Sequence, residues 1–206
     1  MRTDLTRDDL PGREFYKWLT SVVVPRPIAW VSTTSGAGVD NLAPHSFFTV
    51  ASADPPIVQF TSVGRKDSVT NAEATGEFVV NFAPERLQRE INATATGFPP
   101  ETSEFDAVGM EREPSAAVTP PRVAASPVAL ECRLHSTLPM GDSVLVFGEV
   151  AHVSVDSDVL VEGLPDIGRL RPIARLGKNE WGALGEVTAL NRIRYADWPD
   201  GAPHRS

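Results

Sequence analysis

Larger apolar residues occupy every second position of this chain from Val128 to Leu134. A period of two predicts a strand with one buried face. Gly141 and Asp142 separate this segment from a second apolar segment at 144–155. A tight turn between two such segments is typical of a hairpin, so the pattern predicts a long antiparallel pair of strands.

Other apolar segments are short and bounded by turn residues, which also favours β structure. Proline and glycine account for 18 and 15 of the 206 residues, which is more than a helical bundle would tolerate. The further strands that we predict are residues 28–33, 41–48, 57–61 and 77–82. The glycines of loop 34–38 join the first two strands as a hairpin, and Pro55-Pro56 sets the turn before the third.

Helical spacing appears first at 14–24, where Phe15, Trp18, Leu19 and Val22 recur before the prolines that end the pattern. A second helix follows the strand at 57–61. Asp67 or Ser68 would cap its N-terminus, and Gly76 would end it in the left-handed conformation.

A third helix would open at Pro84 and run through Ile91, since proline is tolerated in the first helical turn. Residues 94–127 then lose all periodicity and contain six prolines. We expect this segment to be an extended surface excursion, because strands resume directly after it. Helices that never alternate with strands as a βαβ series predict a mainly β fold, an antiparallel barrel with a few decorating helices.

Composition narrows the function classes. The net charge of −8 would repel nucleic acid and acidic membrane surfaces, so any bound phosphate needs a local basic cluster. The single cysteine, Cys132, excludes an internal disulfide and fits the cytoplasm. No apolar segment approaches the 18 residues of a membrane helix, and the length suggests one domain, 1–206.

The sequence contains no dinucleotide, P-loop, serine-hydrolase or zinc-protease motif. The four histidines show no ligand spacing, so we expect no metal site. Cys132 alternates with apolar neighbours, which is typical of a buried small residue and not of a nucleophile.

Residues 62–68 combine a strand end, a glycine, two basic residues and a helix start. Backbone N–H groups and positive charge in that order suit a phosphate group, although the segment taken alone favours a solvated charged turn. Residues 41–48 mix an amide, an imidazole and two aromatic rings, which could line a cleft for a flat heteroaromatic ligand or belong to the core.

These segments resemble one known family. The blocks 26–33, 41–48, 55–56, 66–68, 77–81, 141–142, 145–150 and 175–177, together with Asn71, are similar, in order and spacing, to the flavin reductase-like, FMN-binding split-barrel family. The likeness covers roughly residues 15–190. It implies an antiparallel Greek-key split barrel that forms a homodimer, with FMN in a groove at the subunit interface.

The resemblance also implies a set of site residues. The FMN phosphate would be held by Ser62, Arg65, Lys66 and Ser68, with Asp67 helping to start the helix. The isoalloxazine and ribityl chain would be lined by Asn41, Pro44, His45, Ser46 and Phe47. Arg175 and Trp181 would close the pocket, from the same or the partner subunit.

The function implied is an NAD(P)H-dependent flavin reductase, in which NADH or NADPH passes hydride to flavin N5 without a catalytic side chain. It would feed reduced flavin to a monooxygenase or another redox protein, or reduce a small acceptor. A flavoredoxin-type electron carrier with a protein donor is the alternative, because Ser143 stands where many family reductases carry histidine. A flavin-binding protein without turnover is a third reading.

Overall fold

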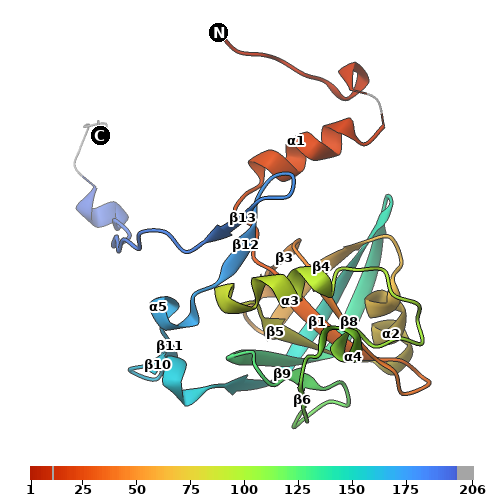
Figure 1. Ribbon diagram of the computed structural model, residues 1–206. Helices are drawn as coiled ribbons and strands as arrows, with labels where there is room; N and C mark the ends of the chain where they lie inside the picture. Colours follow the sequence, from red (N-terminus) through yellow and green to blue (C-terminus); the bar gives the residue numbers. More distant parts are fainter. Residues whose placement is uncertain (11, 199–206) are drawn as a thin grey trace.

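The computed structural model describes residues 1–10 and 12–198. Seven strands form one antiparallel sheet in the order β2-β1-β5-β8-β9-β4-β3 (Figure 1). Their bounds are β1 Ala29–Thr34, β2 Asp40–His45, β3 Phe48–Ser52, β4 Ile57–Val63, β5 Glu77–Phe82, β8 Val128–Met140 and β9 Ser143–Val155. A strand occurs at each predicted segment, and β8 and β9 form the expected long hairpin. The strand predicted at 41–48 ends at His45, however, and Phe48 begins the separate strand β3.

The connection between β2 and β3 rolls the sheet into a barrel. These strands are its two opposite edges, yet only two residues, Ser46 and Phe47, separate them in the chain. The sheet must therefore curl until its edges meet. At the meeting point the Thr61 N–H of β4 donates to the Phe47 carbonyl at 2.8 Å. The result is the mainly β, antiparallel split barrel that the sequence predicts.

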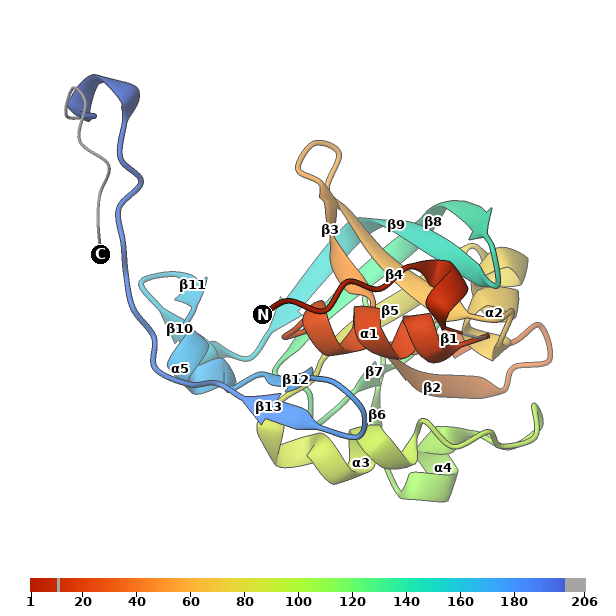
Figure 2. The same cartoon turned by 90° about the horizontal axis from the view of Figure 1, so that it is seen from above.

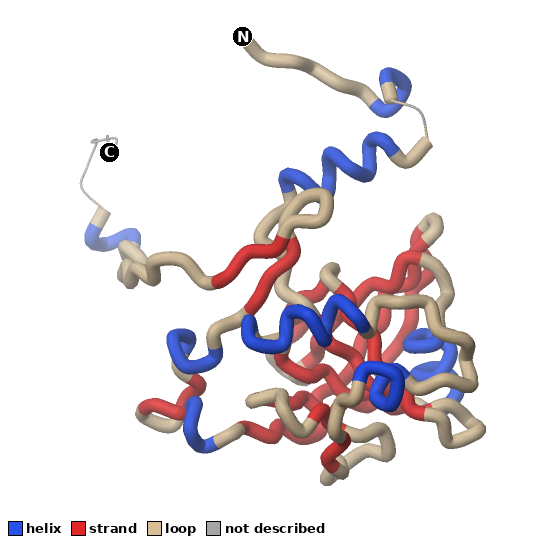
Figure 3. Tube along the Cα trace, viewed as in Figure 1, coloured by secondary structure: helices blue, strands red, loops and turns tan. Residues whose placement is uncertain are grey.

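Helices surround this sheet and do not alternate with its strands (Figures 2 and 3). They are α1 Glu14–Val22, α2 Asp67–Thr75, α3 Gln88–Ala93, α4 Glu104–Val108 and α5 Ile167–Leu170, with 3-10 turns at Arg7–Asp9, Glu85–Leu87, Ser157–Val159 and Tyr195–Asp197. Three small hairpins complete the fold: β6 Arg112–Glu113 with β7 Arg122–Val123, β10 Leu160–Val161 with β11 Leu164–Pro165, and β12 Ile173–Arg175 with β13 Trp181–Ala183.

The predicted ends of α2 are half right. Gly76 ends the helix with φ +76°, a left-handed conformation that favours glycine. The N-cap is Lys66, however, and neither Asp67 nor Ser68 takes that position. Both fall inside the first helical turn, where Ser68 meets Asn41 and His45 of β2.

Strand β1 separates two hydrophobic clusters because its side chains alternate. Ala29 and Val31 point into the barrel, where they pack with Phe60, Phe78 and other buried residues. Ile28 and Trp30 belong to a second cluster outside it, made by Leu42, Ala83, Ile91, Phe105, Met110, Val123 and Ile173. Both faces of the strand are therefore buried, which suits the apolar residues 28–31 at its beginning.

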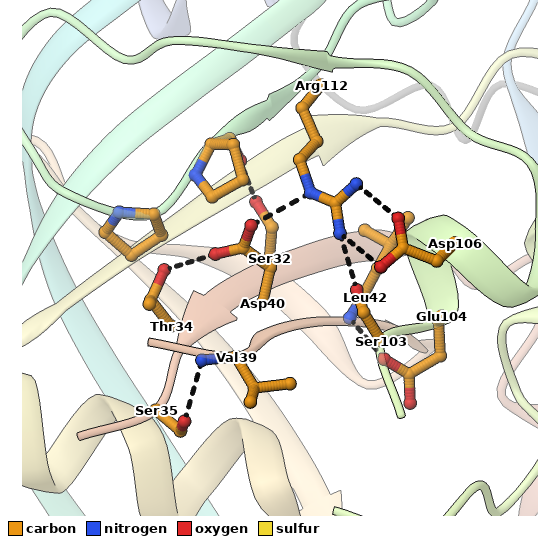
Figure 4. Close-up of polar contacts among 12 residues, drawn as sticks. Ser32, Thr34, Ser35, Val39, Asp40, Leu42, Ser103, Glu104, Asp106 and Arg112 are labelled. Carbon is orange, nitrogen blue, oxygen red and sulfur yellow. Dashed lines mark hydrogen bonds and ion pairs between the residues drawn. The ribbon is translucent and has the colours of Figure 1, made fainter. Parts of the chain in front are cut away.

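The prediction of a surface excursion at 94–127 is wrong. Phe105 and Val123 are 0% and 1% exposed and belong to the second cluster. Arg112 fixes α4 to the barrel by hydrogen-bonding Asp40 of β2 at 2.9 Å and Asp106 of α4 at 2.7 Å (Figure 4). The prolines interrupt any regular spacing, so the buried apolar residues of this segment leave no periodic signal.

A buried carboxylate also holds this segment. Glu131 of β8 is fully buried and accepts the backbone N–H groups of Ala116 and Ala117 at 3.0 and 2.6 Å. Arg122 and His152 approach the same carboxylate at 3.5 and 3.4 Å. The charge is thus compensated, as a carboxylate away from water requires.

The helix predicted at 14–24 is confirmed as α1, but its apolar residues do not enter a core. Trp18, Leu19 and Val22 are 50%, 50% and 67% exposed. Helical spacing located the helix correctly, and among the described residues its apolar face stays largely exposed. Within the described residues no helix is both long and apolar enough to span a membrane.

Candidate functional site

A cavity of about 500 Å³ opens where the barrel is split, between the ends of β2 and β4 and the first turn of α2. Its volume lies in the range of small-molecule and cofactor sites, about 300–1,000 Å³. Nine of the twelve predicted site residues line it: Asn41, Pro44, His45, Ser46, Phe47, Ser62, Lys66, Asp67 and Ser68. The structure therefore brings together residues from three elements.

The first turn of α2 gives this cavity donors and a cation. Across the described chain, the backbone N–H groups of Asp67 and Ser68 donate to no protein acceptor. The Lys66 ammonium pairs with no carboxylate of the described residues. Free N–H groups, the positive end of a helix and an unpaired ammonium together favour a bound anion. These groups fit the phosphate of FMN.

The turn before α2 is shaped by Gly64 and Ser62. Gly64 has φ +82°, and its N–H donates to the Asp142 carbonyl at the β8–β9 turn. The buried Ser62 hydroxyl donates to the Gly64 carbonyl at 2.8 Å. Because its proton is already used, Ser62 builds the turn and leaves donation to a phosphate to its neighbours.

Arg65 does not take the position that the sequence suggested. Its guanidinium turns along α2 and pairs with Glu73, with Nη2 at 3.3 Å from one carboxylate oxygen and Nη1 on the other. It does not line the cavity. Of the two adjacent basic residues, only Lys66 is directed at the site.

His45 lies at the end of β2 and is buried. Its Nε2 is 3.1 Å from the Ser68 hydroxyl oxygen, which also accepts the Asn41 side-chain amide at 3.2 Å. Its ring packs on Phe60, with centroids 4.6 Å apart. Burial, reinforced by the nearby charge of Lys66, lowers the pKa of His45 to about 4. The imidazole is therefore neutral at pH 7, and Lys66 supplies the positive charge.

Aromatic side chains form another part of the wall. Tyr16 of α1 meets Phe47 edge to face, with centroids 6.3 Å apart, and Phe98 lines the same cavity. The Arg26 guanidinium lies 5.8 Å from the Phe47 ring centroid and is held by the Thr20 and Val23 carbonyls. Flat apolar faces of this kind suit a planar heteroaromatic ring.

Arg175 and Trp181 line a separate, smaller pocket of about 200 Å³. They face each other across the β12–β13 hairpin, with the Arg175 guanidinium 4.7 Å from the Trp181 ring centroid. Pro44 and Ser46 line both pockets, so the two adjoin at the split. Arg175 and Trp181 do not line the larger cavity itself, and their closing of the site stays a prediction.

Sequence reasoning missed several lining residues: Tyr16, Ala43, Thr61, Val63, Thr94, Ala95, Thr96, Gly97, Phe98 and Glu104. Glu104 is 6% exposed and its Oε2 accepts the Leu42 N–H at 2.9 Å (Figure 4). Burial raises the pKa of the Glu104 carboxyl, although that hydrogen bond opposes the rise. No local signal marked it, because α4 and β2 meet only in the folded chain.

The thiol of Cys132 does not line the cavity. Cys132 is fully buried inside the barrel, and burial raises the pKa of its thiol to about 12. No group of three metal-binding side chains occurs in the residues that the structure describes. The site can bind an anion and a flat ring next to each other, which suits a redox cofactor.

The chain belongs to the flavin reductase-like family. The model of the flavin reductase like domain matches residues 21–171, which include every cavity element except α1.

Solved structures agree with this family. Nitrilotriacetate monooxygenase component B from Bacillus cereus superposes with a TM-score of 0.88 at 31% identity, covering 92% of this chain and 99% of that one. The 2-nitrobenzoate 2-nitroreductase NbaA of Pseudomonas fluorescens gives 0.87 at 28% identity, with 94% and 98% covered. In fold alone, the chain resembles a Shewanella frigidimarina putative flavin reductase with a split barrel domain, with a TM-score of 0.84, 19% identity and 93% and 100% covered.

Proposed function

We propose that this protein binds FMN in the cavity at the split of the barrel and catalyses reduction of the flavin by NADH or NADPH. The observation that carries the proposal is the first turn of α2, where unpaired N–H groups and the unpaired Lys66 ammonium meet a cavity with aromatic walls. An anion site beside a flat apolar wall matches a phosphorylated flavin in both shape and charge.

Each part of the cavity has a task toward that cofactor. Lys66 and the amides of Asp67 and Ser68 would hold the phosphate. Asn41, Pro44, His45, Ser46 and Phe47 would line the ribityl chain and ring. When bound, the flavin supplies the redox chemistry, accepting a hydride at N5 from the nicotinamide.

The protein's own residues then bind and orient. Because His45 is neutral, its Nε2 can share a hydrogen bond with the Ser68 hydroxyl, which also accepts from the Asn41 amide, without adding a second positive charge to the cavity. Tyr16 and Phe47, in edge-to-face contact, would give the ring an aromatic wall. No side chain needs to act as an acid, base or nucleophile for hydride transfer, which requires contact and alignment.

Two assays test this function. Titrating the flavin-free protein with FMN should quench flavin fluorescence at one FMN per chain. NADH or NADPH oxidation, followed at 340 nm with excess FMN, should then rise in proportion to protein. FMN binding without oxidation of either nucleotide would refute the proposed reductase activity but still support the proposed flavin site.

The second candidate is a flavoredoxin-type electron carrier that takes electrons from a protein donor. Ser143, at the β8–β9 turn, donates to Asp142 at 3.0 Å, and that turn also contacts Gly64 of the cavity's basic segment. A histidine is usual there in family reductases that use nicotinamide. Reduction of bound FMN by a ferredoxin but by neither nucleotide would favour the carrier.

We further propose a homodimer in the cytoplasm that delivers reduced flavin to a monooxygenase or another redox protein. Supporting the dimer, the apolar face of α1 is exposed at Trp18, Leu19 and Val22. Supporting the compartment, Cys132 is free and the chain has no second cysteine. Sedimentation of the purified protein tests the homodimer. Co-purification with a monooxygenase tests the association that delivery of reduced flavin requires.

A further inference from the structure

A second hollow, of about 540 Å³, lies between the start of α3 and the end of α5, and we call it the outer hollow. Most of its lining comes from residues 84–88, from residues 156–159 after β9, and from residues 169–171 of α5. The start of α3 and α5 lie side by side in both views (Figures 1 and 2). None of the predicted flavin-site residues lines this hollow, so the proposed function does not account for it.

Backbone contacts fix the walls of the outer hollow. The Glu85 N–H donates to the Arg171 carbonyl at 2.8 Å, and Pro84 forms a β-bridge with Pro172. Arg171 follows α5 in the left-handed conformation, with φ +45°, which is uncommon for a residue other than glycine. Such conformations persist only where the surrounding structure holds them, and they are concentrated at functional sites. The hollow is therefore preformed by the fold.

Three arginines supply the positive charge of the outer hollow. Arg171 is neutralised, because its Nε and Nη2 both donate to Glu85 Oε2, at 3.2 and 2.8 Å. Arg86 and Arg169 form no ion pair with a carboxylate in the described part of the chain. Backbone carbonyls orient these two instead: Arg169 Nη1 donates to two of them at 3.0 and 3.1 Å, and Arg86 Nη2 donates to that of Ala125.

A carbonyl holds a guanidinium group in place without neutralising it. Among the described residues, Nε and Nη1 of Arg86 and Nε and Nη2 of Arg169 donate to no protein acceptor. The remaining carboxylate of the lining, Asp156, accepts the Asp158 N–H at 3.0 Å and pairs with none of the three arginines. The arginines of the lining outnumber its carboxylates, although the whole chain carries −8. A local surplus of this kind attracts an anion.

We propose that the outer hollow binds a phosphate monoester, with Arg86 and Arg169 holding the phosphate and the organic part lying on Val159 and Leu170. Guanidinium groups suit phosphate because parallel N–H groups meet two of its oxygens. A monoester carries about −1.5 to −2 at pH 7, which two unpaired guanidinium groups compensate. Val159 and Leu170 give the lining an apolar part, which inorganic phosphate would leave unused. The inference does not rest on the proposed flavin site.

Calorimetric titration with phenyl phosphate tests the outer hollow. The Lys66→Ala chain is used, because that variant removes the cation of the flavin cavity. We expect one phenyl phosphate per chain. Benzoate, which has the same ring and a single negative charge, and inorganic phosphate, which has no ring, should both bind more weakly. Absence of saturable binding, or equal binding of either control ligand, would overturn the inference.

Point variants locate the bound phosphate. Arg86→Gln and Arg169→Gln should each weaken phenyl phosphate binding about tenfold or more, because each removes a charge-assisted hydrogen bond. Arg89→Gln is the matched control, since Arg89 is exposed on the same helix as the α3 wall and does not line the hollow. It should leave the affinity nearly unchanged. Equal losses from all three variants, or no loss from the first two, would overturn the inference.

Backbone amide shifts keep the test independent of how the variants fold. In the wild-type chain, phenyl phosphate should shift the amide signals of residues 85–88 and 169–171. Shifts confined to residues 66–68 would place the ligand in the flavin cavity and overturn the inference. FMN titration of Arg86→Gln separates the two proposals, because this variant should lose phenyl phosphate and keep its affinity for FMN.

Discussion

Substituting Lys66 should weaken FMN binding, whereas substituting the adjacent Arg65 should leave FMN affinity nearly unchanged. Lys66 lies in the cavity with no carboxylate partner, whereas Arg65 is paired with Glu73 outside it. A charge-assisted hydrogen bond is worth about 1.5–3 kcal/mol. Lys66→Ala should therefore weaken FMN binding by about 10- to 150-fold. Arg65→Ala removes the same charge but only an exposed ion pair, worth about 0–1 kcal/mol to stability, and should leave FMN affinity within a few-fold.

Flavin fluorescence titrations at 0.15 M salt, on the order of physiological ionic strength, measure this pair of variants. Riboflavin, which has the same ring and ribityl chain without the phosphate, is the matched ligand. Lys66→Ala should lose FMN affinity and keep riboflavin affinity. The reasoning would be refuted if both ligands weakened equally, or if Arg65→Ala cost as much as Lys66→Ala.

Three further predictions concern stability, each read from urea unfolding. The pKa of His45 falls from 6.5 to about 4 on folding, so the unfolded chain gains its proton first as pH drops. Between pH 7 and pH 5 the free energy of unfolding of the wild type should fall by about 2 kcal/mol more than that of His45→Gln. An equal fall in the two proteins would contradict this prediction. Glu131→Ala, which leaves Arg122 without its buried carboxylate, should lower the free energy of unfolding by about 3–5 kcal/mol. A loss under about 1 kcal/mol would mean that the fold does not need this charge. A Cβ at Gly148 would lie 2.2 Å from the Phe78 ring. Gly148→Ala should therefore lower the free energy of unfolding by about 1–3 kcal/mol. An unchanged urea midpoint would show that the Phe78 ring can move aside.

Local patterns explain why so much of the barrel was predictable. The period of two in β8 and the turn at Gly141 specify a hairpin with no knowledge of the rest of the chain. Gly76 likewise marks the end of α2 because few other residues adopt its conformation. The cavity residues on β2 and α2 were found through the family resemblance, which fixes their order and spacing.

The errors arise where folding decides what a residue contacts. Arg65 and Lys66 are equivalent in sequence, and only the start of α2 at Lys66 directs one inward and the other to Glu73. Glu104 reaches the cavity because Arg112 holds α4 against β2, a contact between distant segments. Segment 94–127 looked like surface because prolines hide its buried residues. No local rule detects such contacts.

The most direct measurement of the central claim is the absorbance spectrum of the FMN-loaded protein under anaerobic conditions, before and after NADH and then NADPH. The account predicts a yellow protein whose flavin absorbance is bleached by at least one nucleotide, with one nucleotide consumed per flavin. A loaded protein that neither nucleotide bleaches would contradict the reductase function and point to a protein donor. A protein that takes up no FMN at all would contradict the flavin site itself.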